Sequence, residues 1–168
     1  LNQKENKLAL CSAIAATKSK EIIESRGHKT KNISDFPMIV SDKIESVLKT
    51  SEMVKILRSL NLLQDIERLK SRKPRTGKSL LRGRGTKIGK SVLFVVSKAE
   101  KLSKACNGIP GVDVQTTKNL SVLDLAPGAD PIRLTVYSTT ALKEIGEIKS
   151  PHLELMVSMN WKQKQRIR

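Results

Sequence analysis

The chain has 168 residues, enough for one domain with a proper core and short for two. Lysine and arginine outnumber aspartate and glutamate by 32 to 16, which gives a formal net charge of +16 at pH 7. Such a surface attracts polyanions, so nucleic acid is the first expected partner and an anionic membrane the second. The longest strictly apolar run, residues 92–96, is far shorter than the roughly 20 residues of a spanning helix, which argues against a membrane protein.

The first 70 residues predict helices around one short strand. Asn2 and Glu5 have the spacing of a capping box, and apolar residues then recur at helical intervals. Gly27 is typical of a residue that ends a helix. The expected elements are a helix over residues 3–17, a short helix ending at Arg26, a strand over residues 38–40, a helix marked by Val54, Leu57 and Leu60, and a further turn or two marked by Leu63, Ile66 and Leu69.

A strongly basic stretch follows. No carboxylate lies between Glu67 and Glu100, whereas eleven lysines and arginines do. Residues 71–90 contain four glycines, a proline and no hydrophobic period, which predicts a long loop that is ordered alone or on binding. Three apolar residues should anchor this loop, as a mere linker would not need them: Leu80, Leu81 and Ile88.

The second half alternates strands and helices. Residues 91–96 form an apolar run typical of a strand buried on both faces, and Ser97 with Glu100 has the form of a second capping box. The elements expected next are a helix ending at Gly108, a strand over residues 112–114, a short helical turn with a Pro/Gly bend, a strand over residues 133–138 and a helix ending near residue 147.

This order predicts an α/β fold, with a parallel sheet covered by helices on both faces in a Rossmann-like three-layer arrangement. A further strand upstream of Leu1 is expected to complete the sheet. We expect one domain over residues 1–148, with a basic loop at 71–90, and a basic C-terminal tail over residues 149–168 that is peripheral or partner-bound.

The cysteines and histidines do not form a recognisable site. Cys11 and Cys106 are far apart in apolar helical patterns, and His28 and His152 add no closely spaced ligand pair. We therefore expect buried, reduced thiols in an intracellular compartment, with no metal and no cofactor.

The tripeptide Gly-Lys-Ser occurs twice, at residues 77–79 and 89–91, and raises the question of a nucleotide-binding loop. That loop requires a glycine five residues before its second glycine, where this chain has Arg72 and Arg84. The second copy also leads into a strand, whereas phosphate cradling uses the start of a helix. An NTPase is thus disfavoured, and the lipase-type and zinc-protease motifs are absent as well.

Glycine-spaced arginines and lysines instead suit an irregular polyphosphate. Arginine binds phosphate oxygens with two parallel hydrogen bonds, and glycine lets backbone amides approach phosphates. The chain has only four aromatic residues and no helix with the basic face of a major-groove reader, so folded RNA is favoured over single strands and DNA. The alternatives are a solvated disordered loop, a DNA-compacting protein, and an RNA-modifying or nucleotide-dependent enzyme whose catalytic part lies upstream.

Four blocks of sequence resemble a known family: "KLALCSAIAATKSKEIIESRGH", "SRKPRTGKSLLRGRGTKIGKSVLFVVS", "NGIPGVDV" and "NLSVLDLAPGADPIRLTVYSTTALKEI". Together, over roughly residues 3–147, they are similar to the archaeal and eukaryotic branch of universal large-subunit ribosomal protein four. The family has a first strand and a tunnel-lining extension upstream of the helix that opens this chain.

The resemblance implies a structural, non-enzymatic protein of the cytoplasmic ribosome. Its expected partners are large-subunit rRNA and neighbouring ribosomal proteins, with no membrane and no small-molecule substrate. The "RGH" motif and the basic block from Arg72 to Lys90 imply the RNA contacts. The expected RNA-binding residues are Arg26, His28, Lys29, Arg72, Lys73, Arg75, Gly77, Lys78, Arg82, Gly83, Arg84, Gly85, Lys87 and Lys90.

Overall fold

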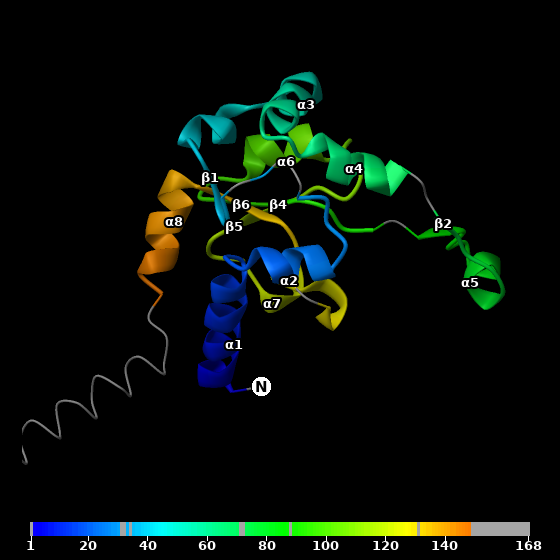
Figure 1. Cartoon of the computed structure of the whole chain (residues 1–168), viewed down its shortest axis with the longest axis horizontal. Coiled ribbons are helices and arrows are strands. Elements are labelled where there is room, and N and C mark those ends of the chain that lie inside the picture. Colours follow the sequence, from blue (N-terminus) through cyan, green and yellow to red (C-terminus); the bar gives the residue numbers. More distant parts are fainter. Residues whose placement is uncertain are drawn as a thin grey trace, which may run out of the picture.

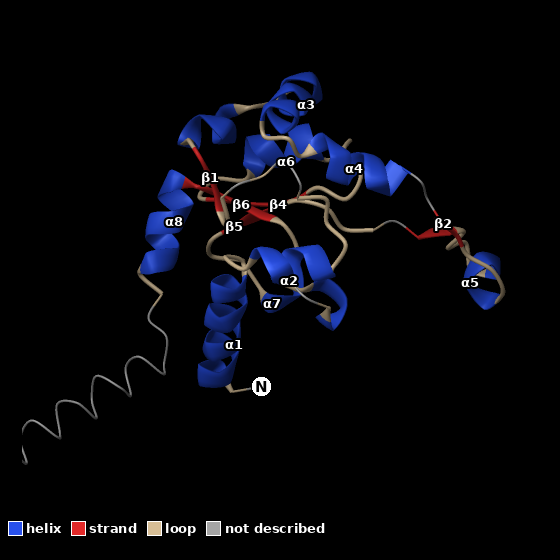
Figure 2. Cartoon of the chain, in the orientation of Figure 1, coloured by secondary structure: helices blue, strands red, loops and turns tan. Residues whose placement is uncertain are grey.

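The computed structural model describes residues 2–30, 33, 35–70, 73–87, 89–130 and 132–148. In these residues a central sheet lies between two layers of helices, as Figures 1 and 2 show. Helices α3, α4 and α6 cover one face, and α1, α2 and α7 lie on the other side. The arrangement confirms the predicted α/β class with helices on both faces of the sheet.

The main sheet has four strands in the order β1-β6-β4-β5, and every neighbouring pair is parallel. Phe94 pairs with Val136 on one side and with Val114 on the other, so β4 lies inside the sheet. The four strands are β1 (Met38–Val40), β4 (Leu93–Val96), β5 (Asp113–Thr116) and β6 (Thr135–Ser138). All residues of β4 and β6 are buried, which explains the unbroken apolar run that marks β4 in the sequence, whereas β6 also buries the polar residues Thr135 and Ser138.

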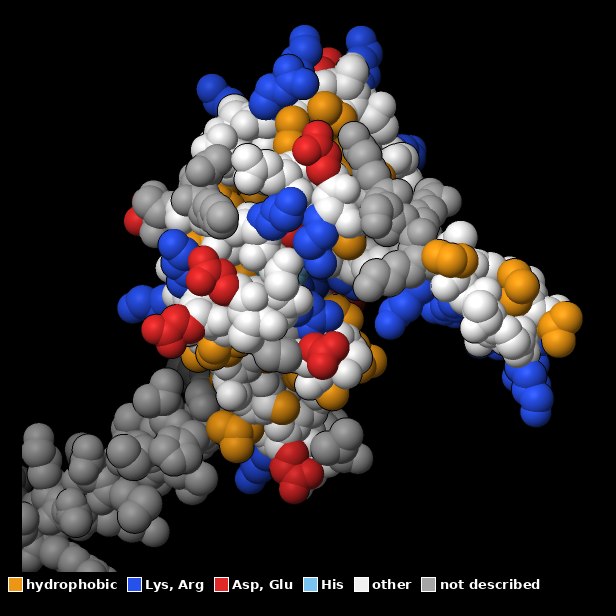
Figure 3. Space-filling view, turned by 45° about the vertical axis from the view of Figure 1, so that its right-hand side comes forward, with side chains coloured by type: hydrophobic (Ala, Val, Ile, Leu, Met, Phe, Trp, Pro, Cys, Tyr) orange, Lys and Arg blue, Asp and Glu red, His pale blue; other side chains and the backbone are white. Residues whose placement is uncertain are grey.

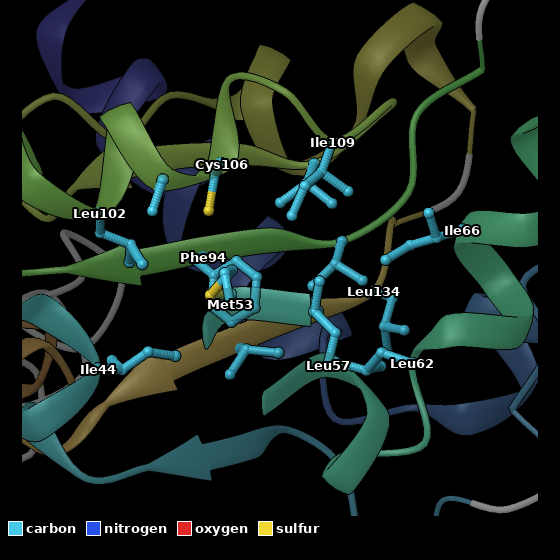
Figure 4. Packing of buried hydrophobic residues seen from close by; sticks show 14 of the residues in the cluster. Ile44, Met53, Leu57, Leu62, Ile66, Phe94, Leu102, Cys106, Ile109 and Leu134 are labelled. Atoms are coloured by element: carbon cyan, nitrogen blue, oxygen red, sulfur yellow. The ribbon is translucent and has the colours of Figure 1, made fainter. Parts of the chain in front are cut away.

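One face of the sheet is covered by η1 (Asp42–Ser46), α3 (Thr50–Ser59), α4 (Leu63–Lys70) and α6 (Glu100–Cys106). Figure 4 shows side chains of these helices packed near Phe94. Met53 and Leu57 come from α3, and Leu102 and Cys106 come from α6. Leu134 continues the cluster toward Leu62 and Ile66. This cluster forms the larger of the two cores.

The other face carries α1 (Gln3–Ala16), α7 (Val122–Leu125) and α8 (Thr139–Gly146). Its core contains Leu93, Val95 and Tyr137 from the strands, whereas Phe94 and Val136 belong to the first face. Alternate strand residues thus serve opposite cores, because successive side chains of a strand point to opposite faces. Further helical segments are α2 (Lys20–Ser25) and η2 (Pro127–Ala129).

The two predicted capping boxes have different outcomes. The box of Asn2 and Glu5 is present at the start of α1. The box of Ser97 and Glu100 is wrong, because Ala99 is the N-cap of α6. Ser97 instead donates its backbone N–H to Glu45 Oε1 (2.9 Å) and its hydroxyl to Glu144 Oε1 (2.6 Å). Charged acceptors from distant helices outcompete the local cap, since hydrogen bonds to carboxylates are the stronger ones.

The described part of the long loop expected over residues 71–90 contains short elements of secondary structure. These are β2 (Lys73–Pro74), α5 (Lys78–Leu81) and β3 (Thr86–Lys87), with β2 and β3 paired antiparallel. Leu80 and Leu81 do not anchor the segment on the core, because their side chains are 54% and 85% exposed. Ile88 lies outside the described residues.

Candidate nucleic-acid interface

Residues 73–87, called the arm below, form a hairpin that projects from the globular domain, as Figure 1 shows. Beyond the β2–β3 pair, the Arg75 amide donates to the Gly85 carbonyl (2.9 Å). Gly77 (φ +66°) precedes α5 and Gly83 (φ +73°) follows it. Both are left-handed conformations that residues with a Cβ adopt at a cost, so glycine shapes the tip of the arm.

The arm carries concentrated positive charge without compensation. Its sequence contains no aspartate or glutamate, and none of the ion pairs in the described residues involves it. Figure 3 shows basic side chains at the root and tip of the projection. The described basic side chains of the arm are half-buried Arg75 and the exposed Lys78, Arg82, Arg84 and Lys87. Such a surface is favourable next to a polyanion.

A buried carboxylate organises the base of the arm. Asp65, on α4, has a side chain that is 0% exposed, and its oxygens accept hydrogen bonds from three separate segments of the chain. The donors are His28 Nδ1 (2.9 Å), the Lys29 amide (3.2 Å), Arg68 Nε (3.1 Å) and the Ser91 hydroxyl (2.5 Å). Asp65 thereby ties the "RGH" segment to the residues on both sides of the arm.

The ionised state of Asp65 follows from this environment. Burial acts to raise the pKa of Asp65, but hydrogen bonds from His28 and Ser91 and the charge of Arg68 outweigh it and hold the pKa at about 2. The carboxylate is therefore charged at neutral pH. A charged acceptor strengthens each hydrogen bond that it receives.

Arg26, His28 and Lys29 have different surroundings. Lys29 is exposed. Arg26 is half-buried and donates from its guanidinium to the Pro127 carbonyl (2.8 Å). Burial lowers the pKa of Arg26, and the nearby positive charges of Arg133 and Arg68 lower it further. The negative charge of Asp130 acts in the opposite direction. Positive groups therefore crowd together on this side of the domain.

His28 is not presented to a partner. Its side chain is 0% exposed, with Nδ1 donating to Asp65 while Nε2 accepts from the Leu134 amide (3.4 Å). The imidazole thus links α4 to Leu134, the residue before β6, and lies next to the exposed Lys29 in the chain. Its complete burial does not support the prediction that His28 contacts RNA.

Arg133 is a structural residue at this site that the sequence analysis missed. Only 1% of it is exposed, and its guanidinium donates to the carbonyls of Ser91 (2.8 Å), Val92 (2.9 Å) and Gly111 (2.9 Å). It also donates to Asp113 Oδ2 (2.6 Å). Burial lowers the pKa of Arg133, and the hydrogen bond and charge of Asp113 oppose that shift. The signal available in the sequence was a lone cation at the start of an apolar strand, which must find a partner when buried.

The return of the chain from the arm into β4 is tightly packed. A Cβ on Gly89 would lie 2.6 Å from Leu69 Cδ2, and a Cβ on Gly111 (φ +76°) would lie 2.2 Å from Leu69 Cδ1. Lys90, which follows Gly89 in the chain, forms an ion pair with Asp113 (2.8 Å). Close packing and this ion pair anchor the base of the arm to the sheet.

Among the described residues, Asp65 joins the segment of His28 and Lys29 to Arg68 and Ser91, which lie on the two sides of the arm. Gly77 and Gly83 are needed for their backbone conformation, whereas a Cβ on Gly85 would meet Leu80 Cδ1 at an ordinary 3.5 Å. Arg72 and the side chain of Lys73 lie outside the described residues.

The opposite end of the sheet argues against a nucleotide site. Nucleotides bind α/β sheets at the carboxyl ends of the strands, where backbone amides receive phosphate. Here a cavity of about 690 Å³ is lined partly by Asp42, Glu45 and Glu100. Glu45 already accepts from the amides of Ser97 (2.9 Å) and Lys98 (3.3 Å). The protein's own carboxylate occupies the amides that a phosphate would need.

The described residues contain neither a metal-binding cluster nor a membrane-spanning helix. No cluster of three or more histidine, cysteine, aspartate or glutamate side chains in this part of the chain could hold a metal ion. None of the helices described here is long and apolar enough to span a membrane.

Known proteins with similar sequences are ribosomal. The large ribosomal subunit protein uL4 of Haloquadratum walsbyi is 44% identical over 148 residues, which cover 88% of this chain and 59% of that protein. The uL4 proteins of Methanococcus aeolicus (43%; 88% and 59%) and Archaeoglobus fulgidus (41%; 88% and 58%) are similar to the same extent. The chain spans about three fifths of the length of these curated relatives.

The sequence also matches the Ribosomal protein L4/L1 family over residues 1–148. That match covers every helix and strand described above and includes the arm. The chain therefore belongs to the Ribosomal protein L4/L1 family, which confirms the resemblance seen in its sequence.

Proposed function

We propose that this chain is a structural component of the large ribosomal subunit, where its arm and the basic residues at the base of the arm bind large-subunit rRNA. The observation that carries the proposal is a projecting hairpin with five described basic side chains and no carboxylate. Membership of a ribosomal protein family supports the choice of RNA. The protein would act in the cytoplasm, on the ribosome, beside neighbouring ribosomal proteins and without enzymatic activity.

The proposed mechanism is charge neutralisation by a preformed surface. Arginines and lysines of the arm contact phosphates and release condensed counterions, which drives binding. Asp65, His28 and Arg133 do not contact RNA but hold the segments that carry the contacts. Because the base is already ordered, less conformational entropy is lost on binding.

The salt dependence of binding tests the proposal. The full chain is titrated with large-subunit rRNA transcribed from Methanococcus aeolicus at several salt concentrations. If about eight phosphates are neutralised, log affinity should fall with log salt at a slope of roughly −6 to −7. A slope near −1 or −2 would contradict the mechanism, and equal affinity for duplex DNA at fixed salt would favour a DNA-compacting protein.

The enzyme alternative has a separate test. A nucleotide-dependent enzyme would bind ATP or GTP with micromolar affinity and lose it on Lys78→Ala or Lys90→Ala. We expect no such affinity, because both Gly-Lys-Ser copies lack the first glycine and Glu45 occupies the amides after β4.

A further inference from the structure

The tip of the arm exposes two adjacent leucines. Leu80 is 54% exposed and Leu81 is 85% exposed, although both belong to an ordered helical turn. Figure 3 shows hydrophobic side chains along one edge of the projection, with basic side chains at its root and tip. Exposure of apolar side chains to water costs free energy, and binding of a partner that covers them recovers this free energy.

The backbone presents these leucines in a defined position. The Leu80 amide donates to the Gly77 carbonyl (3.0 Å), and the Leu80 carbonyl accepts from the Gly83 amide (3.0 Å). The Arg84 amide donates to the Ser79 carbonyl (3.0 Å) and closes the turn. The tip is therefore built before binding, and a partner need not order it.

The charges around the leucines identify the partner. Lys78, Arg82 and Arg84 lie within four residues of the pair, and the arm has no carboxylate. A partner that covers the leucines must also lie against these cations, so it needs dense negative charge beside an apolar face. Unpaired bases in RNA loops and bulges meet this requirement, because phosphates flank each base and its face is free to stack.

We infer that Leu80 and Leu81 pack against unstacked rRNA bases while the neighbouring cations contact the flanking phosphates. The inference rests on the proposed function and deepens it. The arm has no aromatic residue, so these leucines are its only large apolar side chains among the residues the structure describes, apart from Pro74 on β2. Apolar side chains are known to insert beside bases in this way in other nucleic-acid complexes.

The test separates apolar contact from charge. Leu80→Ala and Leu81→Ala should each weaken binding of the Methanococcus aeolicus large-subunit rRNA about tenfold, as expected for loss of a buried leucine side chain. The slope of log affinity against log salt should stay unchanged, because no phosphate contact is lost. Methionine at both positions should retain most of the affinity. Leu48→Ala, in the loop between η1 and α3, is the matched control, since Leu48 is also 54% exposed.

The RNA provides a second readout. Nucleotides held by the tip should show low 2′-hydroxyl acylation in the complex with the unaltered chain and higher acylation with the Leu80→Ala/Leu81→Ala variant, because acylation is fastest at flexible nucleotides. Unchanged affinity and unchanged acylation in that variant would overturn the inference, even if the salt slope remains steep. A shallow slope in the unaltered chain would instead overturn the proposed function, so the two failures are distinguishable.

Discussion

Replacing Asp65 with asparagine should remove the group that holds the base of the arm together. Asparagine has nearly the same size, but it lacks the charge and places an NH₂ group next to donors from His28, Ser91 and Arg68. One or more of these buried donors then loses its acceptor. We expect the free energy of unfolding at pH 7 to fall by about 3 kcal/mol, the scale for a broken buried charge network.

The pH dependence of the unfolding free energy shows how much stability the charge of Asp65 contributes. A fall in the pKa of Asp65 from 3.8 to about 2 corresponds to about 2 kcal/mol of stability. Since the pKa is lower in the folded state, this contribution is complete above about pH 4 and is lost as the pH falls through about 2. The stability difference between the unaltered chain and Asp65→Asn should therefore narrow by about 2 kcal/mol over that interval.

Urea unfolding followed by circular dichroism at pH values from 2 to 7 measures this difference. Asp42, Asp113 and Glu144 also have lowered pKa values, but they are present in both proteins and cancel in the comparison. A variant within about 0.5 kcal/mol of the unaltered chain at pH 7 would refute the reasoning, because effects of that size are ordinary for surface positions. A large difference that does not change with pH would refute the role of the charge.

Three further variants test RNA binding and the packing of the fold. Arg82→Ala with Arg84→Ala should make the slope of log affinity for rRNA against log salt shallower by roughly 1.4 to 1.8. The melting temperature should stay unchanged, because both side chains are exposed. A large fall in the melting temperature without RNA would instead show that the two arginines are structural. Gly111→Ala should destabilise the fold by more than about 2 kcal/mol, since its Cβ would lie 2.9 Å from the backbone carbonyl oxygen of Gly89, which cannot rotate away, at a positive φ. Gly85→Ala, measured in the same urea titration, should change stability by less than about 1 kcal/mol, and an equal loss in both variants would contradict the packing argument.

The helices and strands that sequence analysis predicted well are those with local signals. Asn2 and Glu5 cap α1 because both partners lie within four residues. The strand β4 is buried on both faces, so an unbroken apolar run marks it. The Ser97 cap had an equally good local signal, but Glu45 and Glu144 take its hydrogen bonds from elsewhere in the fold.

The arm shows where local signals are too weak. Its strands are only two residues long and its helix four, so no hydrophobic period marks them. The hairpin exists because Gly77 and Gly83 allow positive φ and the β2–β3 pair closes it. Sequence alone indicated that the stretch is basic and glycine-rich, and the fold turned that composition into a projecting surface.

By itself, the sequence determined the α/β class, the basic glycine-rich stretch and the family, because composition, apolar runs and motif blocks are properties of the chain. Only the tertiary structure decided that His28 is buried, that Arg133 joins the starts of the strands, and that Asp65 collects donors from three segments. These assignments depend on residues far apart in the chain. Such residues become buried and paired only when folding brings them together and removes them from water, so no local sequence pattern predicts these contacts.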